Sequence, residues 1–128
     1  MTDETRKKVL IVDDDKFLLD MYTIKFTENN FDVTAALGSV EALGKIKEGI
    51  DPDVALLDVV MPAMDGFELL ETIKRDKLAP RAKVIILSNL GQQSDIDKGN
   101  ALGADGYIVK ANATPSEVVE KVKEILTH

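Results

Sequence analysis

The sequence contains no cysteine and no tryptophan, and its single histidine is the final residue, His128. Disulfides, thiolate metal sites and thiol nucleophiles are therefore excluded. With one histidine, we also expect neither a histidine-based metal cluster nor a Ser-His-Asp triad. No apolar run is long enough to span a bilayer, and the polar, charged segment Met1 to Lys8 lacks the apolar stretch of a signal peptide. We therefore expect a cytoplasmic protein without a membrane segment.

Positive charge is scarce as well. The chain carries 16 Lys and Arg against 23 Asp and Glu, a formal net charge of −7 at pH 7. Such a surface repels a phosphate backbone, so we expect no direct binding to nucleic acid. The length of 128 residues fits one domain that can bury a core of its own, and no linker or repeat divides it.

Short apolar runs recur along the chain. The clearest lie at residues 9–12, 54–57 and 84–87, and weaker ones at 32–37 and 107–109. Continuous runs rich in β-branched residues are typical of strands buried on both faces, as in a parallel sheet. Helical patterns fill the gaps, so a strand–helix unit occurs five times. This alternation predicts an α/β domain with right-handed crossovers and helices on both faces of the sheet.

The helical patterns also place apolar residues together on one face of each helix. Four apolar residues share one face of the first predicted helix: Phe17, Leu18, Met21 and Ile24. In the second helix a face is shared less cleanly by Val40, Leu43, Ile46 and Lys47, and Ser39 is a candidate N-cap. The last helix follows Thr114, and Pro115 fits its first turn.

Chemically active side chains follow the strong strands. In an open parallel sheet, ligands bind beyond the carboxyl ends of the strands. The residues found directly after the apolar runs are Asp13, Asp14, Asp15, Asp58, Ser88 and Lys110. Clustered carboxylates repel one another, so either some are protonated or a hard cation neutralises them.

The residue types limit what such a site can do. Oxygen ligands without histidine or cysteine favour Mg²⁺, Mn²⁺ or Ca²⁺ over zinc. A carboxylate beside such a cation can attack phosphorus and form an aspartyl phosphate. Lys110 and Ser88 would then meet the charge and the oxygens of the transferred group.

Two segments resemble the receiver domain of bacterial two-component response regulators. Residues 9–15 are similar to the opening strand and acidic pair of that family, and residues 58–70 to its phosphoacceptor strand end and following loop. The intervals from Asp58 to Ser88 and from Ser88 to Lys110 also match the family. The resemblance implies one receiver domain over residues 1–128, with its core at about 7–126. It further implies a doubly wound, flavodoxin-like fold with a five-stranded parallel sheet of order 2-1-3-4-5 and five helices.

The resemblance implies roles for individual residues. Asp58 accepts a phosphoryl group from a sensor histidine kinase or a phosphotransfer protein. Asp13, Asp14, Asp58 and the backbone carbonyl of Val60 hold Mg²⁺, which Mn²⁺ can replace. Asp14 is the more direct ligand, and Asp13 acts partly through water.

By the same resemblance, Lys110 pairs with Asp58 and then with the phosphoryl group, and Ser88 hydrogen-bonds that group. Tyr107 occupies the switch-aromatic position and moves inward when Ser88 moves. The face formed by residues 92–126 then controls a downstream protein or binds a second copy of the chain. We expect a single-domain switch that phosphorylates itself from small donors and slowly loses the group, not an enzyme that turns over a substrate.

Several positions depart from the commonest pattern of the family. Ala111 follows Lys110, where the family usually has a proline that often follows a cis peptide bond, so either geometry is open to this peptide. Asn89 replaces a smaller residue and is expected to narrow access to the site. Val60 and Leu90 occupy positions that tune the phosphoryl lifetime.

Three other functions fit the residues less well. A phosphatase of the haloacid dehalogenase type shares the Asp-x-Asp pattern of residues 13–15, but it expects Thr or Val where Phe17 stands. An inactive receiver-like binding module would not need the acidic set together with Ser88 and Lys110. A flavodoxin would need a phosphate-binding loop where Asp13 and its two acidic neighbours would repel the ligand. We interpret Asp15 as a favourable charge at a helix N-terminus, not as a metal ligand.

Overall fold

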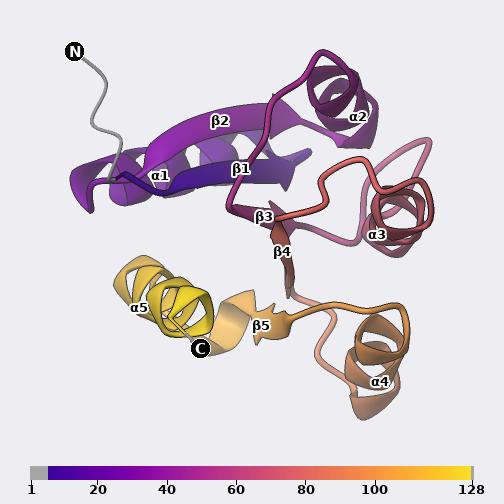
Figure 1. The fold of residues 1–128 in the computed structure, drawn as a ribbon. Coiled ribbons are helices and arrows are strands. Elements are labelled where there is room, and N and C mark those ends of the chain that lie inside the picture. Colours follow the sequence, from indigo (N-terminus) through magenta and orange to yellow (C-terminus); the bar gives the residue numbers. More distant parts are fainter. Residues whose placement is uncertain (1–5, 128) are drawn as a thin grey trace.

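The computed structural model describes residues 6–127, which form five strands and five α-helices in alternating order (Figure 1). The strands are β1 (Lys8–Asp13), β2 (Asp32–Leu37), β3 (Val54–Leu57), β4 (Lys83–Ser88) and β5 (Gly106–Val109). The helices are α1 (Lys16–Glu28), α2 (Ser39–Lys47), α3 (Gly66–Arg75), α4 (Gln93–Ala101) and α5 (Pro115–Leu126), and a short 3₁₀ turn, η1 (Lys110–Asn112), follows β5. His128 lies outside the described residues.

The sheet confirms the predicted topology. All neighbouring strands are parallel, and their order is β2-β1-β3-β4-β5. Every residue of β3 is buried, which agrees with an apolar run covered on both faces. In the register, Leu57 of β3 lies beside Val12 of β1 and Ile86 of β4, so these strands end at nearly the same level. The side chains that follow the strands are therefore brought to one edge of the sheet.

The helices cover both faces of the sheet, as predicted. In Figure 1, α1 and α5 lie together on one side, and α2, α3 and α4 lie on the other. Each side encloses its own apolar cluster. One contains Leu19, Phe26 and Val118 against alternate strand residues, and the other contains Ile46 and Leu69. The alternation arises because successive strand side chains point to opposite faces.

The apolar face that the sequence indicated for α1 is only partly the buried one, with Leu18 and Met21 half-buried against the core cluster. Phe17 and Ile24 are 78% and 61% exposed, and the buried residues are Leu19, Tyr22 and Phe26. The helix carries two apolar stripes, so periodicity alone cannot choose between them. The stripe that faces the sheet contains two aromatic rings, and Phe26 also makes an edge-on contact with Phe31, with ring centroids 5.0 Å apart. Large aromatic side chains bury the most apolar area, which favours this rotation of the helix.

The start of α2 also differs from expectation. Gly38, with φ of 92°, precedes the helix, and Ser39 is already its first residue. The Ser39 hydroxyl is buried and has no hydrogen-bond partner among residues 6–127, so it does not cap the helix. Val40 is 70% exposed, and the buried face consists of Ser39, Ala42 and Ile46. The positive φ at Gly38 turns the chain so that small residues approach the sheet.

The start of α5 agrees with the sequence. The Thr114 hydroxyl accepts a hydrogen bond from the Glu117 N–H at 3.2 Å, and the Glu117 carboxylate accepts one from the Thr114 N–H at 2.9 Å. This capping box places Pro115 in the first turn, as predicted. Within the part of the chain that the structure describes, no helix combines the length and apolar character needed to cross a bilayer.

Candidate functional site at the carboxyl edge of the sheet

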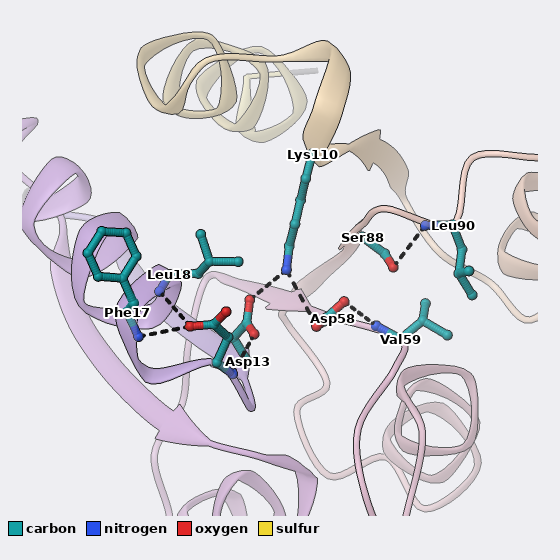
Figure 2. A network of polar contacts seen from close by, with 9 residues as sticks. Asp13, Phe17, Leu18, Asp58, Val59, Ser88, Leu90 and Lys110 are labelled. Carbon is teal, nitrogen blue, oxygen red and sulfur yellow. Dashed lines mark hydrogen bonds and ion pairs between the residues drawn. The ribbon is translucent and has the colours of Figure 1, made fainter.

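Four chemically active residues meet where the strands end (Figure 2). Asp13 is the last residue of β1, Asp58 follows β3, Ser88 ends β4 and Lys110 follows β5. Asp13, Asp58 and Ser88 are 2%, 8% and 1% exposed, so polar groups that normally face water are buried here. Burial of this kind requires close partners, because an unpaired buried charge is costly.

The Lys110 ammonium is the partner of both buried carboxylates. Its Nζ lies 2.7 Å from Oδ2 of Asp13 and 3.4 Å from Oδ2 of Asp58, and Figure 2 shows the side chain extending from η1 to a point between them. The expected pairing with Asp58 is present, but the shorter contact is to Asp13. Burial by itself would lower the pKa of Lys110, but the hydrogen bond with Asp13 and the charge of Asp58 raise it above the ordinary value. The ammonium therefore stays charged.

The Asp58 carboxylate is held from two directions. Its Oδ1 accepts a hydrogen bond from the Val59 N–H at 2.8 Å, and its Oδ2 faces Lys110. Burial raises the pKa of Asp58, and the negative charge of Asp13 adds to this. The Lys110 charge and the Val59 and Ser88 hydrogen bonds lower that pKa but only partly offset the rise. A positive charge added beside Asp58 would therefore stabilise its ionised form.

The acidic group includes a third carboxylate, that of Asp14. Asp13, Asp14 and Asp58 each offer one carboxylate oxygen, and these oxygens lie within 4.8 Å of one another. Asp14 is exposed, so the group opens to solvent on its side. The Lys110 ammonium contacts two of these three carboxylates, those of Asp13 and Asp58, and all of the donors in the group are oxygens. This donor set fits a hard divalent cation such as Mg²⁺ and suits zinc poorly.

Asp15 belongs to the helix and not to the acidic group. Its Oδ1 accepts hydrogen bonds from the N–H groups of Phe17 and Leu18 at 3.0 and 3.2 Å and caps α1. This confirms the interpretation of Asp15 as a helix N-terminal charge. Val60 lies in the exposed loop after β3, with 63% of its surface accessible. The part of its carbonyl in holding a cation stays a prediction.

A chain of hydrogen bonds leads from Ser88 to Tyr107. The Ser88 Oγ accepts a hydrogen bond from the Leu90 N–H at 3.3 Å, and the Tyr107 hydroxyl donates to the Leu90 carbonyl. Tyr107 is half-buried and packs against the core on the side of α2 and α3. Burial raises the pKa of its hydroxyl, and the charges of Asp95 and Asp58 add to this. The ring, which we expected to move inward only after Ser88 moves, is thus already packed inward in this structure.

Gly66 places α3 directly against the backbone of Asp58. A Cβ at this position would lie 1.9 Å from the Asp58 carbonyl oxygen, and the Gly66 N–H donates to the Val59 carbonyl at 2.8 Å. The neighbouring Asp65 caps the helix by accepting from the Glu68 N–H. This close approach has no room for a side chain, so glycine at position 66 allows α3 to contact the loop that carries Asp58.

A groove of about 380 Å³ adjoins the site beside Lys110, and its lining includes Tyr22, Asn89 and Ala111. Asn89 is exposed and lines this groove, and the narrowing of access that was expected from it stays a prediction. The structure contains no cis peptide bond among residues 6–127, so the Lys110–Ala111 peptide is trans. Sequence reasoning missed Tyr22, which is 3% exposed and whose pKa is raised by burial. An apolar-looking position within α1 offered no signal for it.

Comparisons with known proteins agree on one family. The family model of the response regulator receiver domain matches residues 9–123. The chain is 36% identical to the chemotaxis protein CheY of Halobacterium salinarum, with 94% of this chain and 98% of that protein covered. It is 37% identical to CheY of Thermotoga maritima, with 93% and 97% covered. It also superimposes with a TM-score of 0.85 on a CheY-like receiver domain protein of Methanospirillum hungatei, at 36% identity over 96% and 95% of the two chains.

Other curated relatives are longer. The probable transcriptional regulator ycf27 of Guillardia theta is 34% identical, and the match covers 96% of this chain but 46% of that protein. The chain therefore spans about half the length of some relatives and nearly the full length of others.

The raised pKa of Asp58 makes a prediction about stability. The folded state binds the Asp58 proton more tightly than the unfolded state does. The contribution of the Asp58 carboxyl to the free energy of unfolding therefore falls as pH rises from the ordinary aspartate pKa of 3.8 through the pKa of the folded state. We expect Asp58→Asn, without divalent cations, to be more stable than wild type at pH 7 by about 1 kcal/mol. The advantage should vanish below pH 3.8. Urea unfolding across this pH range measures it.

The exposed Asp20, which pairs with Lys16, offers a matched control. Asp20→Asn should change stability by less than about 0.5 kcal/mol at every pH. If Asp58→Asn were instead less stable than wild type at pH 7, the buried carboxylate would be a net stabiliser. Burial and the charge of Asp13 would then not dominate the pKa of Asp58.

Proposed function

This chain belongs to the response regulator receiver domain family, and we propose that Asp58 is the residue on which it carries its phosphoryl group. The family is a phosphoacceptor switch of two-component signalling, and that is the function of this domain. The observation that carries the assignment of Asp58 is its place. It follows β3 at the centre of the acidic edge, with its carboxylate facing Lys110.

The contacts of the three carboxylates support Asp58 as the nucleophile. Both oxygens of Asp13 are tightly held, by the Asp15 N–H at 2.9 Å and by Lys110 at 2.7 Å. Asp14 is exposed and lies outside the contact with the ammonium. Oδ2 of Asp58, at 3.4 Å from Lys110, is held more loosely and keeps lone pairs available for attack.

In a transfer from a phosphohistidine donor, one bond to phosphorus forms and one breaks. An oxygen of Asp58 attacks phosphorus, an O–P bond forms, the P–N bond breaks, and the imidazole nitrogen leaves with the electron pair. Lys110 meets the charge of the incoming group, and the Ser88 hydroxyl donates to one of its oxygens. The family receives its phosphoryl group from a histidine kinase or a phosphotransfer protein, and the donor of this chain is of that class.

Receiver domains bind Mg²⁺ at an acidic pocket, and the carboxylates of this chain fit that ion. We assign Asp13, Asp14, Asp58 and the backbone carbonyl of Val60 as the groups that hold it, with Mn²⁺ as a substitute. When bound, the cation supplies positive charge that offsets repulsion between the carboxylates and the phosphoryl oxygens. Asp13 is already fixed by Asp15 and Lys110, so it forms the rigid side of the site, and the exposed Asp14 forms the open side.

The output of the switch is proposed to pass through Ser88 and Tyr107 to the face of residues 92–126. Ser88 lies beside the acceptor, and Tyr107 is linked to it through the backbone of Leu90. A downstream protein or a second copy of the chain would bind this face. We regard the domain as a switch that loses its phosphoryl group slowly, and the cytoplasmic location stays a prediction. No comparison favours a phosphatase or an inactive binding module.

The assignment of Asp58 is tested by chemical phosphorylation. Incubation with acetyl phosphate and Mg²⁺ should add the mass of one phosphoryl group to the intact protein, because the small donor reaches the buried carboxylate. Asp58→Asn should lose this gain completely. Asp65→Asn keeps a helix-capping side chain at an acidic position outside the acidic group, and it should be phosphorylated like wild type. A mass gain that persisted in Asp58→Asn would move the acceptor to another residue.

Asp14 and Asp15 form a matched pair for testing the cation site. Asp14→Asn and Asp15→Asn each remove one negative charge at adjacent positions, and Asn can still cap α1 at position 15. We expect Asp14→Asn to weaken Mg²⁺ binding at least about tenfold, the scale seen when the ligand environment of a metal is disturbed. Asp15→Asn should have a much smaller effect. Calorimetric titration measures both, and equal losses would show that net charge alone attracts the ion.

The output face is tested with a stable phosphoryl mimic. Beryllofluoride with Mg²⁺ should shift amide NMR signals around Asp58 and also across residues 92–126. Ser88→Ala should keep the first group of shifts and lose most of the second, because it removes the hydroxyl that contacts both the acceptor site and Leu90. Ser94→Ala, which changes an exposed serine of α4, should retain both groups. Distant shifts that survive Ser88→Ala would exclude this route.

A further inference from the structure

Helix α4 is attached to the sheet through very little buried surface. Its sequence from Gln93 to Ala101 is mostly polar, and Gly99 is the single buried residue of this helix, all of which the structure describes. Lys98 adds a contact with α3, since its ammonium lies 4.9 Å from the centre of the Phe67 ring. The position of α4 against the sheet therefore depends largely on what Gly99 touches.

Gly99 touches the ring of Tyr107. A Cβ at position 99 would lie 3.1 Å from Cδ2 and 3.4 Å from Cε2 of that ring, and 3.7 Å from Cγ1 of Ile86. Glycine lowers helix propensity, and its backbone here is ordinary helix, without the positive φ that would call for glycine. The packing accounts for its presence, because the ring edge lies where a side chain would begin.

The same ring is held at its other end. The Tyr107 hydroxyl donates to the carbonyl of Leu90, in the loop between β4 and α4. The ring thus spans the space from this loop to Gly99, in the last turn of α4. A shift of the ring away from Gly99 would draw the hydroxyl away from Leu90 or carry α4 with it.

We propose that Gly99 is a positioning residue, whose missing side chain seats the Tyr107 ring inward with its hydroxyl on Leu90 and so holds the switch poised before phosphorylation. We call the contact between Gly99 and the Tyr107 ring the seat. The seat determines what fraction of the unphosphorylated molecules has the ring in the inward position. A side chain at position 99 competes with the ring for this space and favours the outward ring. The effect on phosphorylation rests on the proposed role of Asp58, but the effect on the ring does not.

Because of thermodynamic linkage, the position of the Tyr107 ring affects the affinity of the acidic site for a phosphoryl mimic, which can be measured. If a phosphoryl group on Asp58 favours the inward ring, then whatever disfavours that ring weakens the binding of a phosphoryl mimic by the same factor. A ligand that needs a conformation present in only a fraction of molecules binds with its affinity reduced by that fraction. Substitution of Gly99 should therefore be felt at the acidic site although Gly99 is not part of it.

The ring itself can be observed directly, because the chain has two tyrosines and no tryptophan. Labelling with 3-fluorotyrosine yields one ¹⁹F NMR signal each for Tyr22 and Tyr107, and Tyr22→Phe assigns them. Gly99→Ala should shift or broaden the Tyr107 signal and leave that of Tyr22 in place, and the longer side chain of Gly99→Ser should enlarge the change.

Gly44 in α2 provides the matched control. It is also a helical glycine, but a Cβ there would meet nothing within 4 Å. Gly44→Ala therefore brings the same gain in helix propensity without a new contact, and both tyrosine signals should stay unchanged. A Tyr107 signal that is unaffected by both Gly99→Ala and Gly99→Ser would overturn the proposal.

Titration with beryllofluoride and Mg²⁺ tests the coupling. Gly99→Ala should weaken the apparent affinity about fivefold or more, within the usual range of coupling between sites, and Gly44→Ala should leave it unchanged. In a Tyr107→Leu background, Gly99→Ala should have no further effect, because the competing ring is gone. An equal loss with and without the ring would show a merely structural effect and would overturn the coupling. Failure of wild type to bind the mimic would instead count against the proposed function, while the ¹⁹F result would still decide the seat.

Discussion

The acidic edge of the sheet depends on one buried cation, the ammonium of Lys110. It lies between Asp13 and Asp58, and its side chain is 8% exposed. Two buried carboxylates this close would repel each other strongly without it, since low polarity amplifies charge interactions. The pair it forms with Asp13 is the tighter of the two, and this leaves Asp58 only partly neutralised. A site that must accept further negative charge is therefore held together by an interaction that can be redistributed when the charge arrives.

Backbone contacts connect this site to the neighbouring helices α3 and α4. Gly66 brings α3 against the Asp58 carbonyl, so the loop after β3 and the helix are in close backbone contact. On the other side, the Leu90 peptide links the Ser88 hydroxyl to the Tyr107 hydroxyl, and the Tyr107 ring rests on Gly99 of α4. α3 thus contacts the loop of Asp58 through its backbone, whereas α4 contacts Tyr107 and Ile86 through Gly99 and α3 through Lys98. This difference is the basis on which we propose that α4 responds.

The departures from the common receiver pattern concern access to the site and leave its charges in place. Ala111 follows Lys110 through a trans peptide, and the ammonium still reaches both carboxylates. Asn89 lines the groove beside Lys110 together with Tyr22. The contacts among Asp13, Asp58 and Lys110 therefore form with alanine at position 111 and asparagine at position 89.

The strands and the convergence of the site residues were predictable from the sequence, because buried parallel strands require continuous apolar runs and their carboxyl ends must meet at one edge. Asp15 and Pro115 were also interpreted correctly, since helix caps depend on local residues. The buried face of α1 was only partly predictable, because the helix carries two apolar stripes and only the packing of Tyr22 and Phe26 decides between them. Nor could the sequence show that Lys110 lies closer to Asp13 than to Asp58, or that Gly99 and Tyr107 share one space. Such choices depend on distances between residues remote in the chain, which only the folded structure sets.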